Sequence, residues 1–128
     1  MAAAPKFAKT HEWIRLDDDG LATVGISAYA VEALTDLVFM QLPEVGRAVK
    51  AGESIGEIES VKAVSDFYAP VSGEVVEVNA TLPSKLETLG QDPYGAGWLV
   101  KLRPTDTGEL AGLLDEAAYD ALVKSQPH

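Results

Sequence analysis

Short segments that alternate apolar and polar residues recur along the first hundred positions, separated by turn residues, and this pattern constrains the fold most strongly. A turn at 17–20 joins the first two segments, where Gly20 allows the positive φ of a tight connection. Residues 80–97 contain proline and glycine and are predicted to be mostly loop. Strands are predicted at 6–16, 21–26, 37–42, 54–61, 64–68, 74–79 and 98–102.

Helical patterns occur in two places. Ser27 can cap the first turn of a short helix at 28–34, because its side-chain oxygen can accept a free backbone N–H. After Pro104 the strand pattern stops, and a short helix is predicted near 109–114. A longer helix follows Asp115, which can cap it, and its apolar side chains share one face.

This order of elements predicts a mostly β barrel or sandwich with a short helix in its N-terminal half and helices at its C-terminus. The 128 residues favour one domain, 1–128, with a mostly β core at 1–104 and C-terminal helices at 105–125. Hydrophobic residues make up 47% of the chain, enough to bury a core. The aromatic residues predicted to lie in that core are Trp13, Phe39, Phe67 and Trp98.

Acidic residues outnumber basic ones, with 20 Asp and Glu against 10 Lys and Arg, for a net charge of -10. Repulsion from phosphates argues against binding to nucleic acid or to anionic membranes, and the charge suits docking onto protein partners through acidic patches. No apolar run approaches the ~20 residues of a membrane span. The first strand begins a few residues after the initiating Met, which leaves no room for a transit peptide. We therefore expect a bacterial cytoplasmic protein.

The residues that bind metals are scarce in this chain. There is no cysteine, which excludes disulfides, thiol nucleophiles and thiolate metal sites. The two histidines are His11 and His128, and the pair His11-Glu12 lacks the second histidine of a zinc protease motif. We expect no metal site and interpret His11 as a packed or hydrogen-bonded side chain.

One lysine stands between two predicted strands, in the segment 57–73. Lys62 is therefore expected at the tip of a hairpin, between the small residues Ser60 and Ala63. A lysine in a turn is ordinarily a solvated charge. A protruding turn on two rigid strands, however, also lets a modifying enzyme reach the amine and gives an attached arm a fixed base.

The order of residues around Lys62 is specific. Glu59-Ser60-Val61-Lys62-Ala63, followed by Ala69-Pro70-Val71-Ser72-Gly73, resembles the lipoylation segment of glycine cleavage H proteins. A biotinyl domain typically has methionines on both sides of its lysine, where this chain has valine and alanine. Further motifs resemble the same family in consistent order over about residues 7–124: Thr10-His11-Glu12-Trp13, Val24-Gly25-Ile26, Leu42-Pro43-Glu44-Val45-Gly46, and Gln91-Asp92-Pro93-Tyr94-Gly95 with Gly97-Trp98.

The resemblance implies a lipoyl-domain-like barrel/sandwich hybrid that is a carrier and not a catalyst. Its cofactor would be lipoate in amide linkage to Lys62, an arm that accepts the aminomethyl group of glycine. The implied partners are glycine decarboxylase with pyridoxal phosphate, aminomethyltransferase with tetrahydrofolate, dihydrolipoyl dehydrogenase, and a lipoate-attachment enzyme. We expect a monomer.

The resemblance also implies a cleft that protects the loaded arm from water and holds its ammonium group. It points to Glu12 and Asp66 as the carboxylates of this cleft, with Thr10 as a neutral hydrogen-bonding neighbour. The alternative is that Glu12 is a solvent-facing strand residue and Asp66 a charge on the hairpin. Tyr29 departs from the family, since many members have a histidine there, and residues 81–90 are also atypical.

Three alternatives remain open at this point. The first is a different swinging-arm module, such as an acyltransferase lipoyl domain or a biotin carrier, although the chain lacks the flexible linker of those modules. The second is an unmodified interaction module or a lipoyl donor that passes lipoyl groups to other enzymes. The third is a small enzyme acting through Glu12, His11 and Asp66, which predicts turnover without an attached cofactor.

Overall fold

The computed structural model describes residues 5–17, 19–34 and 36–125. Asp18 in the predicted turn 17–20, and His128, lie outside the described residues. The strands are β1 (Lys6–Phe7), β2 (Glu12–Leu16), β3 (Ala22–Ile26), β4 (Leu37–Gln41), β5 (Ala48–Val49), β6 (Ser54–Ser60), β7 (Val64–Tyr68), β8 (Gly73–Val78) and β9 (Val100–Pro104). The helices are α1 (Ala28–Leu34), α2 (Glu87–Gln91) and α3 (Glu116–Ser125), with 3₁₀ turns η1 (Leu82–Ser84) and η2 (Thr107–Gly112).

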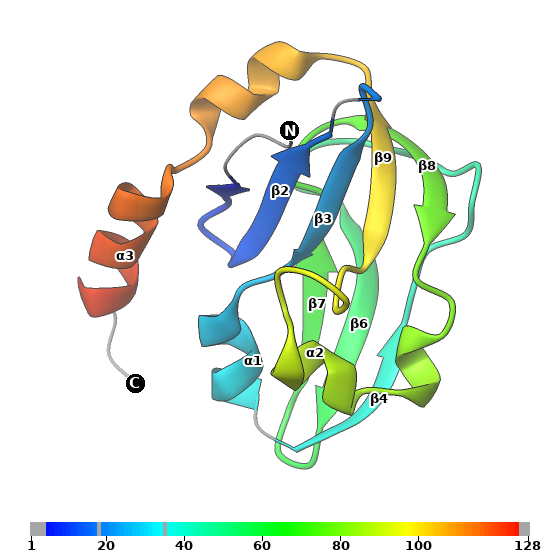
Figure 1. Ribbon diagram of the computed structural model, residues 1–128, viewed down its shortest axis with the longest axis vertical. Coiled ribbons are helices and arrows are strands. Elements are labelled where there is room, and N and C mark those ends of the chain that lie inside the picture. The colour runs from blue at the N-terminus through cyan, green and yellow to red at the C-terminus, as the bar shows by residue number, and fades with distance from the viewer. Residues whose placement is uncertain (1–4, 18, 35, 126–128) are drawn as a thin grey trace.

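Two open sheets pack face to face, so the mostly β prediction is confirmed and the architecture is a sandwich without a closed barrel among the described residues. The larger sheet has the order β1-β2-β3-β9-β8-β5, and the smaller sheet has the order β4-β6-β7. The pairings between neighbouring strands of these two sheets are antiparallel. In Figure 1, α1 and α2 lie together near the end of the sandwich where the β6–β7 hairpin turns, and α3 lies beyond β1.

The core lies between the sheets and is made of aliphatic side chains from both, with Phe67 and Met40. A second cluster contains Trp13, Phe7 and Tyr119. Phe39 contradicts the prediction of a core aromatic, because it points from β4 into solvent with 46% of its surface exposed. Its neighbour Met40 faces the core instead, as alternation along a strand requires.

The predicted strand 6–16 is divided in two. Residues 8–11 form a turn in which the His11 N–H donates to the Ala8 carbonyl at 2.9 Å. His11 has a φ of 81°, a left-handed conformation that extended strands do not contain. Residues 9–12 are all polar and interrupt the apolar pattern, but no glycine or proline in the segment marks a turn.

The segment 80–97 contains more structure than predicted, namely η1 and the helix α2. Leu82 and Leu89 are buried, and with Leu86 they have the i, i+4, i+7 spacing of a helix face. Pro83 and Gly90 obscured this spacing, although a proline in the first turn is compatible with a helix. The last strand also ends later than predicted, since Pro104 lies within β9.

Both predicted caps are present. The Ser27 hydroxyl oxygen accepts the Ala30 N–H at 3.2 Å, and an Asp115 carboxylate oxygen accepts the Ala118 N–H at 2.8 Å. The short helix expected near 109–114 is the 3₁₀ turn η2. Within the described ranges, no helix is long and apolar enough to span a membrane, and no His, Cys, Asp and Glu cluster fits a metal ion.

Candidate functional site

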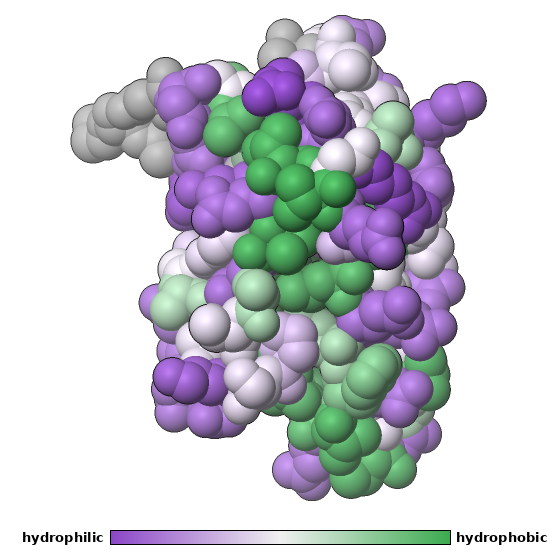
Figure 2. Space-filling model, turned by 90° about the vertical axis from the view of Figure 1, so that its right-hand side faces the viewer, coloured by the Kyte–Doolittle hydropathy of each residue, from purple (hydrophilic) through white to green (hydrophobic). Residues whose placement is uncertain are grey.

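Lys62 lies at the exposed tip of the β6–β7 hairpin. The register pairs Glu59 with Val64, which leaves the connecting residues at the turn. The strands and turn next to the lysine carry exposed apolar side chains: Val38, Phe39, Val61 and Val64. In Figure 2 hydrophobic residues gather at the lower end of the molecule, the end at which the hairpin turns in Figure 1. The tip therefore presents one amine within an apolar surface.

Ser60 fixes the conformation of this tip. Its hydroxyl oxygen accepts the Lys62 N–H at 3.3 Å and the Ala63 N–H at 3.2 Å. Its own N–H donates to the Ala63 carbonyl at 2.8 Å, and the Val61 N–H donates to the Asp36 carbonyl at 3.0 Å. The backbone of Lys62 is thus held while its side chain extends into solvent.

A cleft of about 380 Å³ lies beside the hairpin, between α1, β7 and the turn before β2. Ala63, the residue after Lys62, lines it, so the cleft begins next to the tip. The structure brings Thr10, Glu12 and Asp66 together along this cleft, although more than fifty residues of sequence separate Asp66 from the other two. The other lining residues are mainly small or apolar: His11, Ile26, Tyr29, Ala30, Ala33, Leu34, Ile58, Ser65 and Phe67.

Glu12 is buried and not solvent-facing, because only 1% of its surface is exposed. One carboxylate oxygen accepts the Thr10 hydroxyl, and the other accepts the Tyr68 N–H at 3.1 Å. The Glu12 side chain on β2 thereby accepts a backbone N–H of the edge strand β7 and joins the two sheets. Burial raises the pKa of Glu12 above its ordinary value, and these hydrogen bonds oppose the shift.

Asp66 and Tyr29 lie at the rim of the same cleft. Asp66 is exposed on β7, so its carboxylate can turn toward a ligand. Tyr29 projects from α1, and its ring lies 4.9 Å from the His11 ring. The residue that departs from the family therefore faces the predicted docking set.

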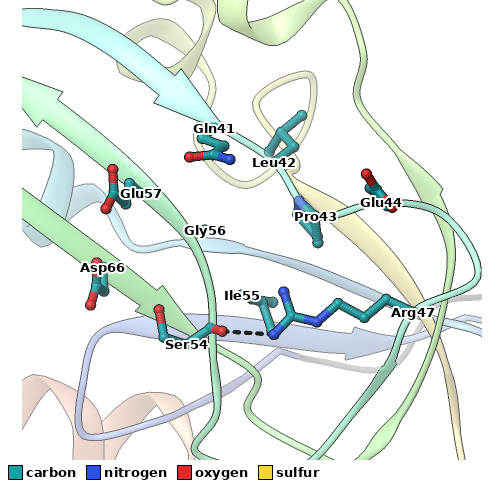
Figure 3. Close-up of a pocket in the computed structure, with 10 residues that line it drawn as sticks. All are labelled: Gln41, Leu42, Pro43, Glu44, Arg47, Ser54, Ile55, Gly56, Glu57 and Asp66. Atoms are coloured by element: carbon teal, nitrogen blue, oxygen red, sulfur yellow. Dashed lines mark hydrogen bonds between the residues drawn. The ribbon is translucent and has the colours of Figure 1, made fainter.

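A second groove, of about 530 Å³, lies on the other side of Asp66. Its cation is Arg47, which pairs with Glu53 at 2.6 Å and donates to the Ser54 carbonyl at 3.2 Å (Figure 3). Neither Lys62 nor Ala63 lines this groove. The smaller cleft is therefore the candidate site.

Sequence reasoning missed two contributors. Ser60 was interpreted only as a small residue that leaves room for the amine, although serine two residues before a turn tip commonly accepts backbone N–H groups. Tyr119 lies on the predicted apolar face of the last helix, and the sequence gives no sign that its hydroxyl contacts Ser27 and His11, about ninety and a hundred residues earlier. No local pattern indicates a contact of that separation.

A β sandwich with a single lysine at the tip of a fixed hairpin is the architecture of a lipoyl-type domain. The family model described as "Glycine cleavage H-protein" matches residues 5–126. The chain belongs to the glycine cleavage H-protein family.

Relatives in that family cover almost all of the chain. A "Glycine cleavage system H protein" from Phenylobacterium zucineum is 55% identical over 118 residues, covering 92% of this chain and 97% of that one. The protein of the same name from Symbiobacterium thermophilum is 53% identical, covering 93% of this chain and 92% of its own. A crystal structure of a glycine cleavage system H protein from Mycobacterium marinum matches with a TM-score of 0.84 at 50% identity, covering 91% of this chain and 94% of that one.

Proposed function

We propose that Lys62 is joined to lipoate by an amide bond and that the chain is the non-catalytic carrier of a glycine cleavage system. The observation that supports this most directly is the fixed hairpin tip, where an exposed amine lies beside a mainly apolar cleft. The lysine fits the group, because the tip is reachable by an attachment enzyme without unfolding. Amide formation removes the charge of Lys62 and leaves an arm that can enter the cleft.

A lipoyl group on Lys62 would supply a dithiolane able to carry the aminomethyl group between glycine decarboxylase and aminomethyltransferase, and its reduced form would be the substrate of dihydrolipoyl dehydrogenase. The contribution of this chain is to position and protect. Ala33, Leu34 and Ile58 exclude water from the cleft between encounters. Asp66 holds the ammonium group from the rim, since its carboxylate is exposed there.

Glu12 has a different role from Asp66 in this proposal. Both of its oxygens already accept protein hydrogen bonds, so it orients Thr10 and contributes negative potential from behind the cleft surface. Thr10 then presents its hydroxyl oxygen to the arm. The protection therefore depends on one exposed carboxylate, Asp66, and one buried, hydrogen-bonded carboxylate, Glu12.

The attachment is tested by intact mass of protein purified from lipoate-replete cells. We expect one lipoyl increment in the unaltered chain, none in Lys62→Arg, and the full increment in the control Lys50→Arg, which alters another exposed lysine. An increment that persists in Lys62→Arg, or its absence from the unaltered chain, contradicts the proposal. Glycine-dependent loading with methylamine then separates a glycine cleavage carrier from a lipoyl donor, which is modified but not loaded.

The cleft is tested by the lifetime of the aminomethyl group on the loaded carrier. Changing Glu12→Gln and Asp66→Asn together removes both charges while keeping the shapes, and we expect faster hydrolysis. The matched control is Glu57→Gln, which removes a carboxylate from the opposite groove. If the double variant retains the original hydrolysis rate, the assignment of these carboxylates is wrong.

A further inference from the structure

The hydroxyl of Tyr119 lies where three distant parts of the chain meet. Tyr119 is the buried residue of α3, with 4% of its surface exposed. Its hydroxyl oxygen lies 2.7 Å from His11 Nδ1 and 2.6 Å from Ser27 Oγ. Neither contact is needed to bury the ring, which stacks on Phe7 at a centroid distance of 4.3 Å.

The protons of these three groups can satisfy every partner. Burial raises the pKa of Tyr119 to about 12, so the phenol remains protonated near neutral pH. The Ser27 hydroxyl can donate to Tyr119, and Tyr119 can donate to Nδ1 of a neutral His11 imidazole. Ser27 Oγ still accepts the Ala30 N–H at the start of α1.

The His11 contact acts on one side of the cleft. The left-handed φ of His11 sets the direction in which Thr10 and Glu12 leave the turn. Its backbone is held by Ala8, and its carbonyl accepts the Ser27 N–H at 2.9 Å. Left-handed conformations of non-glycine residues persist where surrounding contacts over-determine them, and the contact with Tyr119 is one of these.

The Ser27 contact acts on a second segment that bounds the cleft, the helix α1. Ser27 caps α1, and that helix supplies Tyr29 and Leu34 to the cleft. A seven-residue helix is too short to be stable by itself, so its direction depends on its cap and its packing. Tyr119 itself does not line the cleft, yet one oxygen atom contacts both of the segments that bound it.

We propose that Tyr119 is a positioning residue: its hydroxyl links the side chains of His11 and Ser27, in addition to their backbone hydrogen bond, and thereby holds the shape of the cleft that protects the loaded arm. This inference rests on the proposed function of the cleft. The helix α3 is then part of the carrier mechanism and not only a cover for Phe7. The effect passes through His11 and Ser27, since Tyr119 touches neither the arm nor Lys62.

The test is Tyr119→Phe, which keeps the stacked ring and removes both hydrogen bonds. In the unmodified chain, we expect the ¹⁵N shift of His11 Nδ1 to change and the amide signals of Thr10 and Tyr29 to move. In the lipoylated chain, we expect full attachment at Lys62 and aminomethyl hydrolysis about fivefold faster, the scale of one net hydrogen bond. The matched control is Leu122→Ala, which weakens packing around Tyr119 but keeps its hydroxyl.

The proposal is overturned if the His11, Thr10 and Tyr29 signals in Tyr119→Phe match those of the unaltered chain. It is also overturned if the hydrolysis rate is unchanged, or if Leu122→Ala accelerates hydrolysis equally, since the role would then be general packing. Failure of the proposed function looks different, because Lys62 would then bear no lipoyl increment in any variant. The signals from the unmodified chain test the positioning of the cleft in that case as well.

Discussion

The hairpin tip and the cleft are neighbours along β7, but they are held in different ways. The tip is fixed by backbone groups and a single side chain, Ser60, while Lys62 extends into solvent. The cleft is bounded by segments that meet only in the folded chain. Glu12 joins the two sheets there, and Tyr119 joins α3 to His11 behind it. The site of attachment is therefore locally determined, whereas the place of protection is a property of the whole fold.

This difference predicts how each region tolerates change. Substitutions at an exposed tip alter chemistry and leave the free energy of unfolding nearly unchanged. Substitutions in a buried hydrogen-bonded network alter both the chemistry and the free energy of unfolding, because each remaining partner becomes an unpaired polar group. The five predictions below test this comparison, taking the residues in order of decreasing effect on stability.

The largest effect is expected at Trp13, behind the cleft. Its side chain is fully buried, its indole N–H donates to the Pro93 carbonyl at 2.9 Å, and it faces Gly25, where an added Cβ would lie 2.6 Å from the indole nitrogen. Trp13→Ala should lower the free energy of unfolding by about 3–5 kcal/mol, measured by urea denaturation. A loss below about 1 kcal/mol would show that the cleft does not depend on this packing.

The next effect is expected at Glu12. Glu12→Ala should cost about 1–3 kcal/mol, because the Tyr68 N–H and the Thr10 hydroxyl lose their acceptor inside the fold. Denaturation midpoints and slopes measured at one pH give this number. An unchanged stability would mean that water replaces the carboxylate and that the sheets are not joined through it.

The same residue predicts a pH dependence with a definite sign. Burial raises the pKa of Glu12 in the folded chain above the ordinary value of 4.5, so the folded state binds this proton more tightly than the unfolded state. The contribution of Glu12 titration to the free energy of unfolding is therefore fully present below the ordinary pKa of 4.5. It is lost as the pH rises through the raised pKa of the folded chain. The control is Glu53, whose pKa is lowered mainly by its hydrogen bond from Arg47, so its stability is lost as pH falls. Subtracting the stability curves of Glu12→Gln and Glu53→Gln from that of the unaltered chain should give slopes of opposite sign.

A smaller effect is expected at Ser60. Ser60→Ala removes the acceptor of the Lys62 and Ala63 N–H groups and should cost about 1 kcal/mol. Hydrogen exchange of these two amides should accelerate, and lipoyl attachment should slow without moving to another lysine. Unchanged exchange at the tip would show that the β6–β7 pairing alone fixes it.

The smallest effect on stability is expected for Asp66→Asn. The side chain is exposed, so the free energy of unfolding should change by less than about 0.5 kcal/mol. The aminomethyl lifetime should nevertheless shorten, which separates function from stability at this position. A change in stability comparable to that of Glu12→Ala would show that the two carboxylates are equally structural and would remove the distinction between rim and interior.

Much of the fold could be predicted from local sequence because its elements are defined by nearest neighbours along the chain. The caps Ser27 and Asp115 act within three residues, and the last strand shows the two-residue period of a sheet, with Val100 and Leu102 buried. The predictions failed where tertiary contacts override such patterns. Phe39 stands in the continuous apolar run 37–40, which does not show which side chains face the core, and it faces solvent. The helix α2 depends on the burial of Leu89 within a sequence rich in turn residues.

The sequence by itself determined that a hairpin presents Lys62 and which family the chain resembles, because turn chemistry and strand alternation are local properties. Only the tertiary structure decided that Thr10, Glu12 and Asp66 share one cleft, that Glu12 is buried, and that Tyr119 contacts the residues bounding it. Those relations depend on how the sheets and α3 pack. Packing brings together residues that the sequence separates by fifty to more than a hundred positions, so no local pattern records them.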